Sequence, residues 1–184
     1  MQQIKGAVLI SRLNFVEQQF GADAVERVLS QLNEEDQRAL RMPLTVRWYP
    51  FELGRRLDDA IVRVLGGGDP ALFERLGEAS AEKNLTTLHK SFLTRGDAHA
   101  FLQKAPAIYA HYYETGRREY VKTGEREGVL TTYDAETYSA ADCLTVIGWY
   151  RRALEMCGVK GVRIVEEVCR AKGGPYCRYR ISWD

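Results

Sequence analysis

The residues best suited to chemistry are three cysteines and one glutamate near the end of the chain: Cys143, Glu166, Cys169 and Cys177. Thiolates are strong zinc ligands, and a carboxylate oxygen can complete a tetrahedral zinc site. Cys169 and Cys177 flank a glycine-containing turn, so they can approach each other across a hairpin. Cys143 is expected near a helix N-terminus, where the helix dipole lowers the pKa of a thiol. These four residues are therefore a candidate structural zinc site.

The spacing of these residues leaves two questions open. Small free cysteines also pack apolar cores without a metal, and this spacing is not the common CxxC pair. Strict strand alternation places Glu166 and Cys169 on opposite faces and would instead put Glu167 on the face of Cys169. A β-bulge can bring Glu166 to the cysteines, and periodicity alone does not decide between the two glutamates.

Aromatic residues form a second candidate site, a ligand pocket lined by Tyr109, Tyr112, Tyr113 and Trp149. Such side chains give apolar walls with hydroxyl or indole donors that can orient a small ligand. Tyr150 and Trp48 could join them. The alternative is that these aromatic residues only pack the core.

The elements that position these residues are helical in the first two thirds of the chain. Apolar residues at helical spacing, caps and glycine stops predict helices, with an extended segment at 43–50 between two prolines. We expect helices at about 9–20, 23–32, 34–41, 53–65, 70–84, 86–93 and 106–115. Asn33 and Asp69 are expected as N-caps.

The pattern changes after Gly116 to strands at 117–123 and 129–133, joined by a glycine-containing loop. A capping box at Ser139 and Asp142 opens a helix to Met156, and two more strands follow at 162–169 and 177–183. This predicts an α+β fold in which the N-terminal helices pack on one face of a roughly four-stranded antiparallel sheet, made of two hairpins separated by a helix. We expect one domain over 1–184, with a mainly helical part at 1–115 and a β-hairpin–helix–β-hairpin part at 116–184.

The composition excludes several classes of protein. A net charge of +1 and a pI of about 7.7 give no strong positive field for binding nucleic acid. Arg117-Arg118 and Arg151-Arg152 are interpreted as solvated faces, although either pair could border a partner site. The chain lacks an apolar stretch long enough to span a bilayer and a signal-peptide pattern, so we expect a cytoplasmic protein with reduced cysteines and no membrane contact. GxSxG, HExxH and Walker A motifs are absent, which indicates that it is not an enzyme.

The C-terminal segment resembles a known family. Gly148-Trp149-Tyr150, Glu166-x-x-Cys169 and Gly173-Gly174-Pro175-Tyr176-Cys177-Arg178-Tyr179 are similar to the second half of the vinyl-4-reductase-type domain. That domain shares a fold superfamily with heme-NO-binding domains and transport-protein-particle (TRAPP) subunits. In the related sensor domains of phenol- and xylene-responsive activators, three cysteines and a glutamate hold a structural zinc beside an aromatic-ligand pocket. The resemblance implies these roles for Cys143, Glu166, Cys169 and Cys177.

Over its whole length the chain resembles a family of uncharacterised bacterial paralogues of the myxobacterial type. The resemblance is carried by Ile4-Lys5-Gly6, Trp48-Tyr49-Pro50-Phe51-Glu52-Leu53, Ala79 with Asn84, Tyr112-Tyr113 and Ser182-Trp183. It implies the fold but no known activity.

The histidines bear on the heme of that superfamily. His89, His99 and His111 stand in no pattern that marks an axial ligand, and the Tyr-x-Ser-x-Arg triad of heme-NO-binding domains is absent. These observations argue against heme, so zinc is the expected cofactor.

Two functions follow from these observations. The first is a non-catalytic sensor that binds a small hydrophobic or aromatic ligand and signals through an unidentified partner protein. The alternative is a TRAPP-like interaction scaffold without a ligand. In either case, dimers of this superfamily meet through helices, so we expect a homodimer formed by the N-terminal helices.

Overall fold

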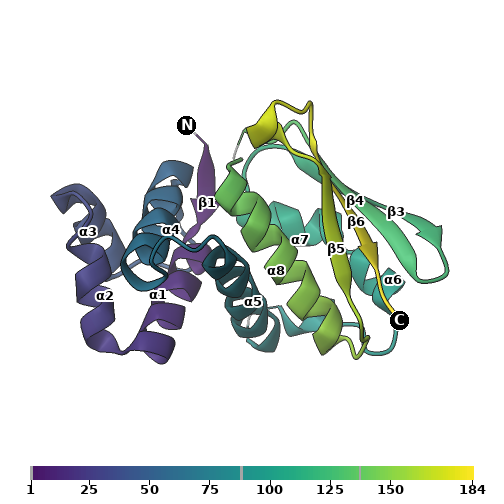
Figure 1. The fold of residues 1–184 in the computed structure, drawn as a ribbon, viewed down its shortest axis with the longest axis horizontal. Coiled ribbons are helices and arrows are strands. Elements are labelled where there is room, and N and C mark those ends of the chain that lie inside the picture. Colours follow the sequence, from purple (N-terminus) through teal and green to yellow (C-terminus); the bar gives the residue numbers. More distant parts are fainter. Residues whose placement is uncertain (1, 88, 137) are drawn as a thin grey trace.

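The computed structural model describes residues 2–87, 89–136 and 138–184 (Figure 1). The α-helices within these residues are α1 (Gly6–Phe20), α2 (Ala22–Leu29), α3 (Glu34–Arg41), α4 (Phe51–Leu65), α5 (Ala71–Thr86), α6 (Ala98–Leu102), α7 (Ala105–Tyr112) and α8 (Ala140–Met156). The strands are β1 (Gln3–Lys5), β2 (Trp48–Pro50), β3 (Arg117–Gly124), β4 (Glu127–Tyr133), β5 (Arg163–Val168) and β6 (Cys177–Ser182), and short 3-10 turns occur at Lys90–Phe92 and Arg170–Lys172. No helix in the described part of the chain is long and apolar enough to cross a membrane.

The main sheet has four antiparallel strands in the order β3-β4-β6-β5. Its two hairpins are separated by α8, which confirms the predicted α+β fold class. Alternation in β6 turns Cys177, Tyr179 and Ile181 into the core, because successive side chains point to opposite faces. Figure 1 shows α8 running alongside the sheet, with α1 to α4 on the far side of α5.

A small second sheet was not predicted. Strands β1 and β2 pair antiparallel, with Ile4 opposite Tyr49, and Ile4 also bridges to Tyr113. Within the segment predicted as extended, only Trp48–Pro50 is a strand. A strand of three residues carries too little alternation to be recognised without its distant partner.

The predicted caps at the two best-marked helix starts are confirmed. Asn33 accepts a hydrogen bond from the Asp36 amide (2.8 Å), and Ser139 accepts one from the Asp142 amide (2.9 Å). Asp69 instead accepts from the amide of Ala71 (3.0 Å), so α5 begins one residue later than predicted.

The helix predicted at 86–93 is wrong. Helix α5 continues to Thr86, and the described residues that follow, up to Leu93, form only the 3-10 turn Lys90–Phe92. Leu88, inside the predicted helix, lies outside the described residues.

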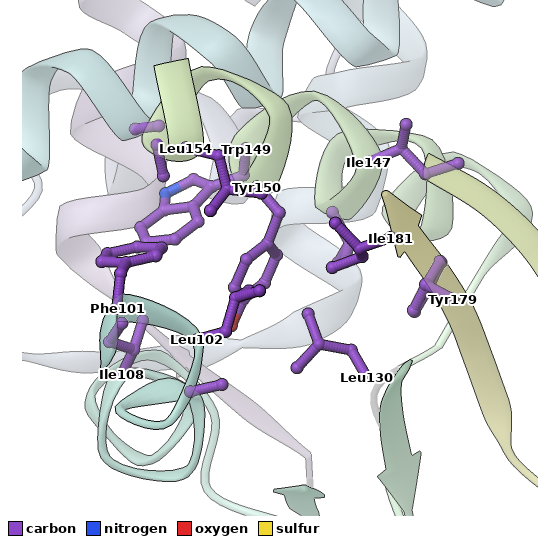
Figure 2. Packing of buried hydrophobic residues seen from close by; sticks show 14 of the residues in the cluster. Phe101, Leu102, Ile108, Leu130, Ile147, Trp149, Tyr150, Leu154, Tyr179 and Ile181 are labelled. Atoms are coloured by element: carbon purple, nitrogen blue, oxygen red, sulfur yellow. The ribbon is translucent and has the colours of Figure 1, made fainter. Parts of the chain in front are cut away.

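Two clusters of buried apolar residues lie on either side of α5. Leu76 of α5 belongs to the cluster of the N-terminal helices, whereas Ala81 and Leu85 belong to the cluster between α5, α6, α7, α8 and the main sheet. Figure 2 shows part of the second cluster, where Trp149 and Tyr150 extend from α8.

Helices α5 and α8 pack along their length with unusually close backbones. A Cβ atom added at Gly77 would lie 2.0 Å from the carbonyl oxygen of Thr145. One added at Gly148 would lie 1.9 Å from the carbonyl oxygen of Glu74. Only glycine allows this approach. The contact fixes where Cys143 and Trp149 of α8 lie along the axis of α5.

Candidate metal and ligand sites

The three predicted cysteines lie together in the structure. The Sγ atom of Cys143, in the first turn of α8, is 3.6 Å from that of Cys169 and 3.7 Å from that of Cys177. All three sulfur atoms lie within 4.8 Å of one another and are buried. A tetrahedral zinc with Zn–S bonds near 2.3 Å would separate two sulfur atoms by about 3.8 Å. The spacing therefore fits a zinc ion, and the fourth cysteine, Cys157, is buried outside the group.

A tight turn brings Cys169 and Cys177 together. Gly173 has φ of 89°, and the amide of Gly174 donates to the carbonyl oxygen of Cys169 (2.9 Å). A Cβ on Gly174 would lie 2.6 Å from Val168 Cγ1, so the turn needs glycine at this position. The Arg170 amide donates to Cys177 Sγ (3.4 Å), a hydrogen bond that stabilises a thiolate.

Glu166 reaches the cysteines through an irregularity in strand β5. The register between β5 and β6 shifts between Glu166 and Val168, which is the bulge that alternation required. Oxygen Oε2 of Glu166 accepts from Lys172 (2.6 Å), while Oε1 is buried without a hydrogen-bond partner among the described residues. Glu167 lies on the other face, where it pairs with Arg180 (2.6 Å). The Glu166 carboxylate interacts with Cys169 but lies outside the group of three sulfur atoms, so Glu166 is the candidate for a fourth ligand.

The thiol pKa values differ from the sequence expectation. The predicted lowering of the Cys143 pKa by the helix dipole is not found: its hydrogen bond to Cys177 and its burial raise the pKa. The same hydrogen bond, with the Arg170 amide, lowers the pKa of Cys177 to about 6, whereas burial raises that of Cys169. The cluster therefore favours one thiolate, at Cys177.

The predicted pocket residues also lie together, around a cavity of about 40 Å³ that is partly open to solvent. The cavity lies between α1, α5, α7, α8 and β3. Its lining residues are Val8, Arg12, Gly77, Ser80, Ile108, Tyr109, Tyr112, Tyr113, Arg118, Thr145, Val146, Trp149 and Tyr150. Trp48 is not among them, because it lies in β2 under the ammonium group of Lys5.

Aromatic contacts fix the walls of this cavity. The Trp149 ring lies 6.4 Å from that of Phe101 and 5.0 Å from that of Tyr150, and Figure 2 shows these three side chains close together. The Trp149 ring also lies 6.4 Å from the ring of Tyr112. Tyr109 stacks on Tyr113 at 4.8 Å. Each ring is held by its neighbours, so the cavity has a defined shape.

Polar atoms within the cavity are incompletely satisfied. The hydroxyls of Tyr112 and Tyr150 are buried without a hydrogen-bond partner among the described residues. Burial raises the pKa of Tyr112, so its hydroxyl stays protonated and can donate. The Tyr113 hydroxyl, in contrast, donates to Asp142 Oδ1 (2.9 Å), and that of Tyr109 donates to the Thr115 carbonyl (2.7 Å).

Sequence reasoning missed the charged residues of the cavity. Arg118 was interpreted as part of a solvated face, but it is 6% exposed and lines the cavity. Arg12 is also buried and pairs with Asp58 (3.0 Å). The alternation of β3 carried a signal for Arg118, since Arg117 and Glu119 on either side of it are exposed.

None of the three histidines lines the cavity. His89 and His111 lie near each other, with ring centroids 4.8 Å apart, and His111 is exposed. The His99 ring nitrogens lie 2.6 Å from the Tyr120 hydroxyl and 2.7 Å from the Glu125 carbonyl oxygen.

Solved structures with a similar fold are H-NOX proteins. The unliganded Fe(II) H-NOX protein from K. algicida has a TM-score of 0.75 at 15% identity, covering 98% of this chain and 96% of that chain. The Fe(II)NO H-NOX protein from S. oneidensis has a TM-score of 0.73 at 14% identity, covering 98% and 99%. A third structure, from work on heme distortion in the H-NOX family, has a TM-score of 0.75 at 12% identity, covering 98% and 95%.

This likeness corrects the expectation on heme. The argument against heme used a missing motif and the surroundings of histidines, yet the chain has the fold of proteins that bind heme. In the conformation described here the residues do not themselves form a heme site. Among the described residues no histidine lines the cavity, and the aromatic side chains of Tyr109, Tyr112 and Trp149 occupy the space around it.

Comparison with curated proteins found no match. A family model described as a protein of unknown function, DUF2378, matches residues 14–184, which is most of the sequence. The chain therefore belongs to the DUF2378 family.

Proposed function

We propose that this chain is a non-catalytic sensor domain that binds a small, largely apolar ligand in the cavity of Tyr109, Tyr112, Tyr113 and Trp149. The observation that carries the proposal is the pair of buried hydroxyls at the cavity, on Tyr112 and Tyr150, that lack hydrogen-bond partners among the described residues. A buried unsatisfied polar group costs about 1–3 kcal/mol. A ligand that hydrogen-bonds these hydroxyls removes that cost, so its binding is favoured.

The fold and the C-terminal resemblance support a sensor. The similar H-NOX structures include one with iron-bound NO, and the resemblance is to sensor domains with an aromatic-ligand pocket. Both are consistent with a fold that holds a small molecule between helices and sheet. Output would pass to a partner protein.

A structural zinc is the second part of the proposal. Cys143, Cys169 and Cys177 would hold it, with Glu166 as the fourth ligand. Bound zinc would supply a rigid link between the start of α8 and the β5–β6 hairpin. Because α8 also carries Trp149 and Tyr150, ligand binding and the cysteine cluster act on the same helix.

Calorimetry and thermal melting with phenol, benzyl alcohol, m-xylene and hexanol test the ligand site. We expect at least one to bind and raise the melting temperature, and Trp149→Ala to abolish its binding. Tyr133→Phe, which alters a half-exposed tyrosine outside the cavity, is the control and should bind normally. If no compound of this panel or of the acids tested below binds the wild type, the sensor proposal is wrong.

One observation favours the scaffold as the second candidate. Met42, Leu44 and Val46, in the segment between α3 and β2, are 85%, 59% and 79% exposed. Exposed apolar residues close together are typical of protein contact sites. A homodimer through the N-terminal helices would cover them, and light scattering at micromolar concentration should then show a dimer that Leu44→Asp with Val46→Asp dissociates. A monomer at these concentrations would remove this candidate.

A further inference from the structure

The cavity contains a buried positive charge, that of Arg118, which has no carboxylate partner among the described residues. The Nε of Arg118 donates to the Thr132 hydroxyl (2.9 Å), and its guanidinium lies over the rings of Tyr109 (4.8 Å) and Tyr150 (5.5 Å). Among the described residues, no carboxylate lies within ion-pair distance of Arg118. The other buried arginine of the cavity, Arg12, is in contrast neutralised by Asp58 at 3.0 Å.

Asp142, a carboxylate that interacts with Arg118 electrostatically, is already engaged by another residue. Asp142 interacts with both buried guanidiniums only at longer range, and its carboxylate accepts the hydrogen bond of Tyr113. The ring faces and the Thr132 hydroxyl stabilise the Arg118 charge in part, but neither supplies a negative charge. A buried guanidinium is costly unless it is paired, and its fork of N–H donors matches a carboxylate with two hydrogen bonds.

The rest of the cavity defines the other half of a ligand. Val8, Ile108, Val146 and Trp149 give apolar walls. The enclosed volume of about 40 Å³ is that of about three water molecules, at about 10–15 Å³ each, which suits a carboxylate head group. An apolar body would extend along Trp149 toward the open side.

From this geometry we infer that the ligand is a small apolar monocarboxylic acid whose carboxylate pairs with Arg118 and accepts hydrogen bonds from Tyr112 and Tyr150. This inference rests on the proposed sensor function and adds the ligand's charge. The hydroxyls then gain an acceptor and the guanidinium gains a counter-ion in one binding event.

Titration calorimetry with benzoate, its neutral isostere benzamide, and phenol tests the inference on the full chain. Wild-type protein should bind benzoate at least tenfold more tightly than benzamide. Arg118→Met keeps the side-chain length and should weaken benzoate binding at least tenfold, with benzamide and phenol unchanged. Arg117→Met changes the exposed neighbour on β3 and should bind benzoate like the wild type.

The outcomes separate the inference from the function on which it rests. If phenol or benzamide binds the wild type as tightly as benzoate does, the inference that the ligand carries a carboxylate is wrong. The proposed sensor function is then not contradicted. If benzoate, benzamide, phenol and the other neutral compounds all fail to bind, both the inferred carboxylate ligand and the proposed sensor function are wrong. If Arg118→Met does not fold by circular dichroism, the wild-type comparison of benzoate with benzamide still decides. Tyr150→Phe then gives a second test, because it should weaken benzoate more than benzamide.

Discussion

The sulfur atoms of Cys143 and Cys177 lie 3.7 Å apart although 34 residues separate them in the sequence. Cys169 completes the group at 3.6 Å from Cys143. Three sulfur atoms at this spacing come from a helix, a strand end and a second strand. Measuring the metal content of the protein tests directly whether these three sulfur atoms bind zinc.

Protein purified without a metal-affinity tag should contain about one zinc per chain by mass spectrometry. Cys143→Ser, Cys169→Ser and Cys177→Ser should each lose it, and the melting temperature should fall, because zinc binding contributes to folding free energy. Cys157→Ser is the matched control, since that thiol is buried outside the cluster. If the wild-type chain takes up no zinc even after titration with ZnCl2, the three cysteines pack the core without a metal.

The two neighbouring glutamates give a sharper comparison. Glu166→Gln should weaken zinc affinity by tenfold or more, at least as much as the roughly 10–100-fold loss seen for outer-shell partners. Glu167→Gln should leave zinc affinity unchanged, because that carboxylate pairs with Arg180 on the opposite face. Competition with a zinc chelator measures both. Equal affinities in the two variants would exclude Glu166 as a ligand.

The close approach of α5 and α8 predicts a large cost for small substitutions. Gly77→Ala and Gly148→Ala should each lower the free energy of unfolding by about 3 kcal/mol or more, because the added methyl group meets backbone atoms. Gly124→Ala is the control, where the nearest atom to an added Cβ is 3.4 Å away. Urea unfolding of the three variants measures the difference. Similar stabilities for Gly77→Ala and Gly124→Ala would contradict the observed helix contact.

Removing one partner of the buried Arg12–Asp58 pair should destabilise the fold. Arg12→Met should cost roughly 3–5 kcal/mol, because it leaves the Asp58 carboxylate buried and unpaired. Arg41→Met breaks an exposed pair with Glu26 and should change the free energy of unfolding far less, because solvent screens that pair. Chemical unfolding measures both values, and comparable losses would show that burial of the first pair carries no penalty.

The fold was predictable where local signals and long periodicity agree. Asn33 and Ser139 mark helix starts by their own hydrogen bonds, and the alternation of β6 identifies its buried face without reference to the rest of the chain. Strands β1 and β2 were not predictable because each has only three residues, and their pairing joins distant parts of the sequence.

The candidate sites were predictable in composition but not in detail. Residue types and spacing identified the cysteines and the cavity tyrosines as candidates. That the cysteines bind a metal and that the tyrosines bind a ligand are still predictions. The choice between Glu166 and Glu167 depends on a register shift in β5, which periodicity does not encode. Arg118 was missed because adjacent arginines usually indicate a solvated surface, and the alternation of β3 alone does not show that Arg118 packs against Tyr109 and Tyr150.

The glycine contacts between α5 and α8 have a consequence for how a signal would travel. Backbone touches backbone there, so no side chain can change rotamer to absorb a movement of one helix against the other. A shift of α8 caused by a bound molecule must carry α5 with it. Since α5 also packs against the N-terminal helices through Leu72 and Leu76, the displacement reaches the surface farthest from the sheet.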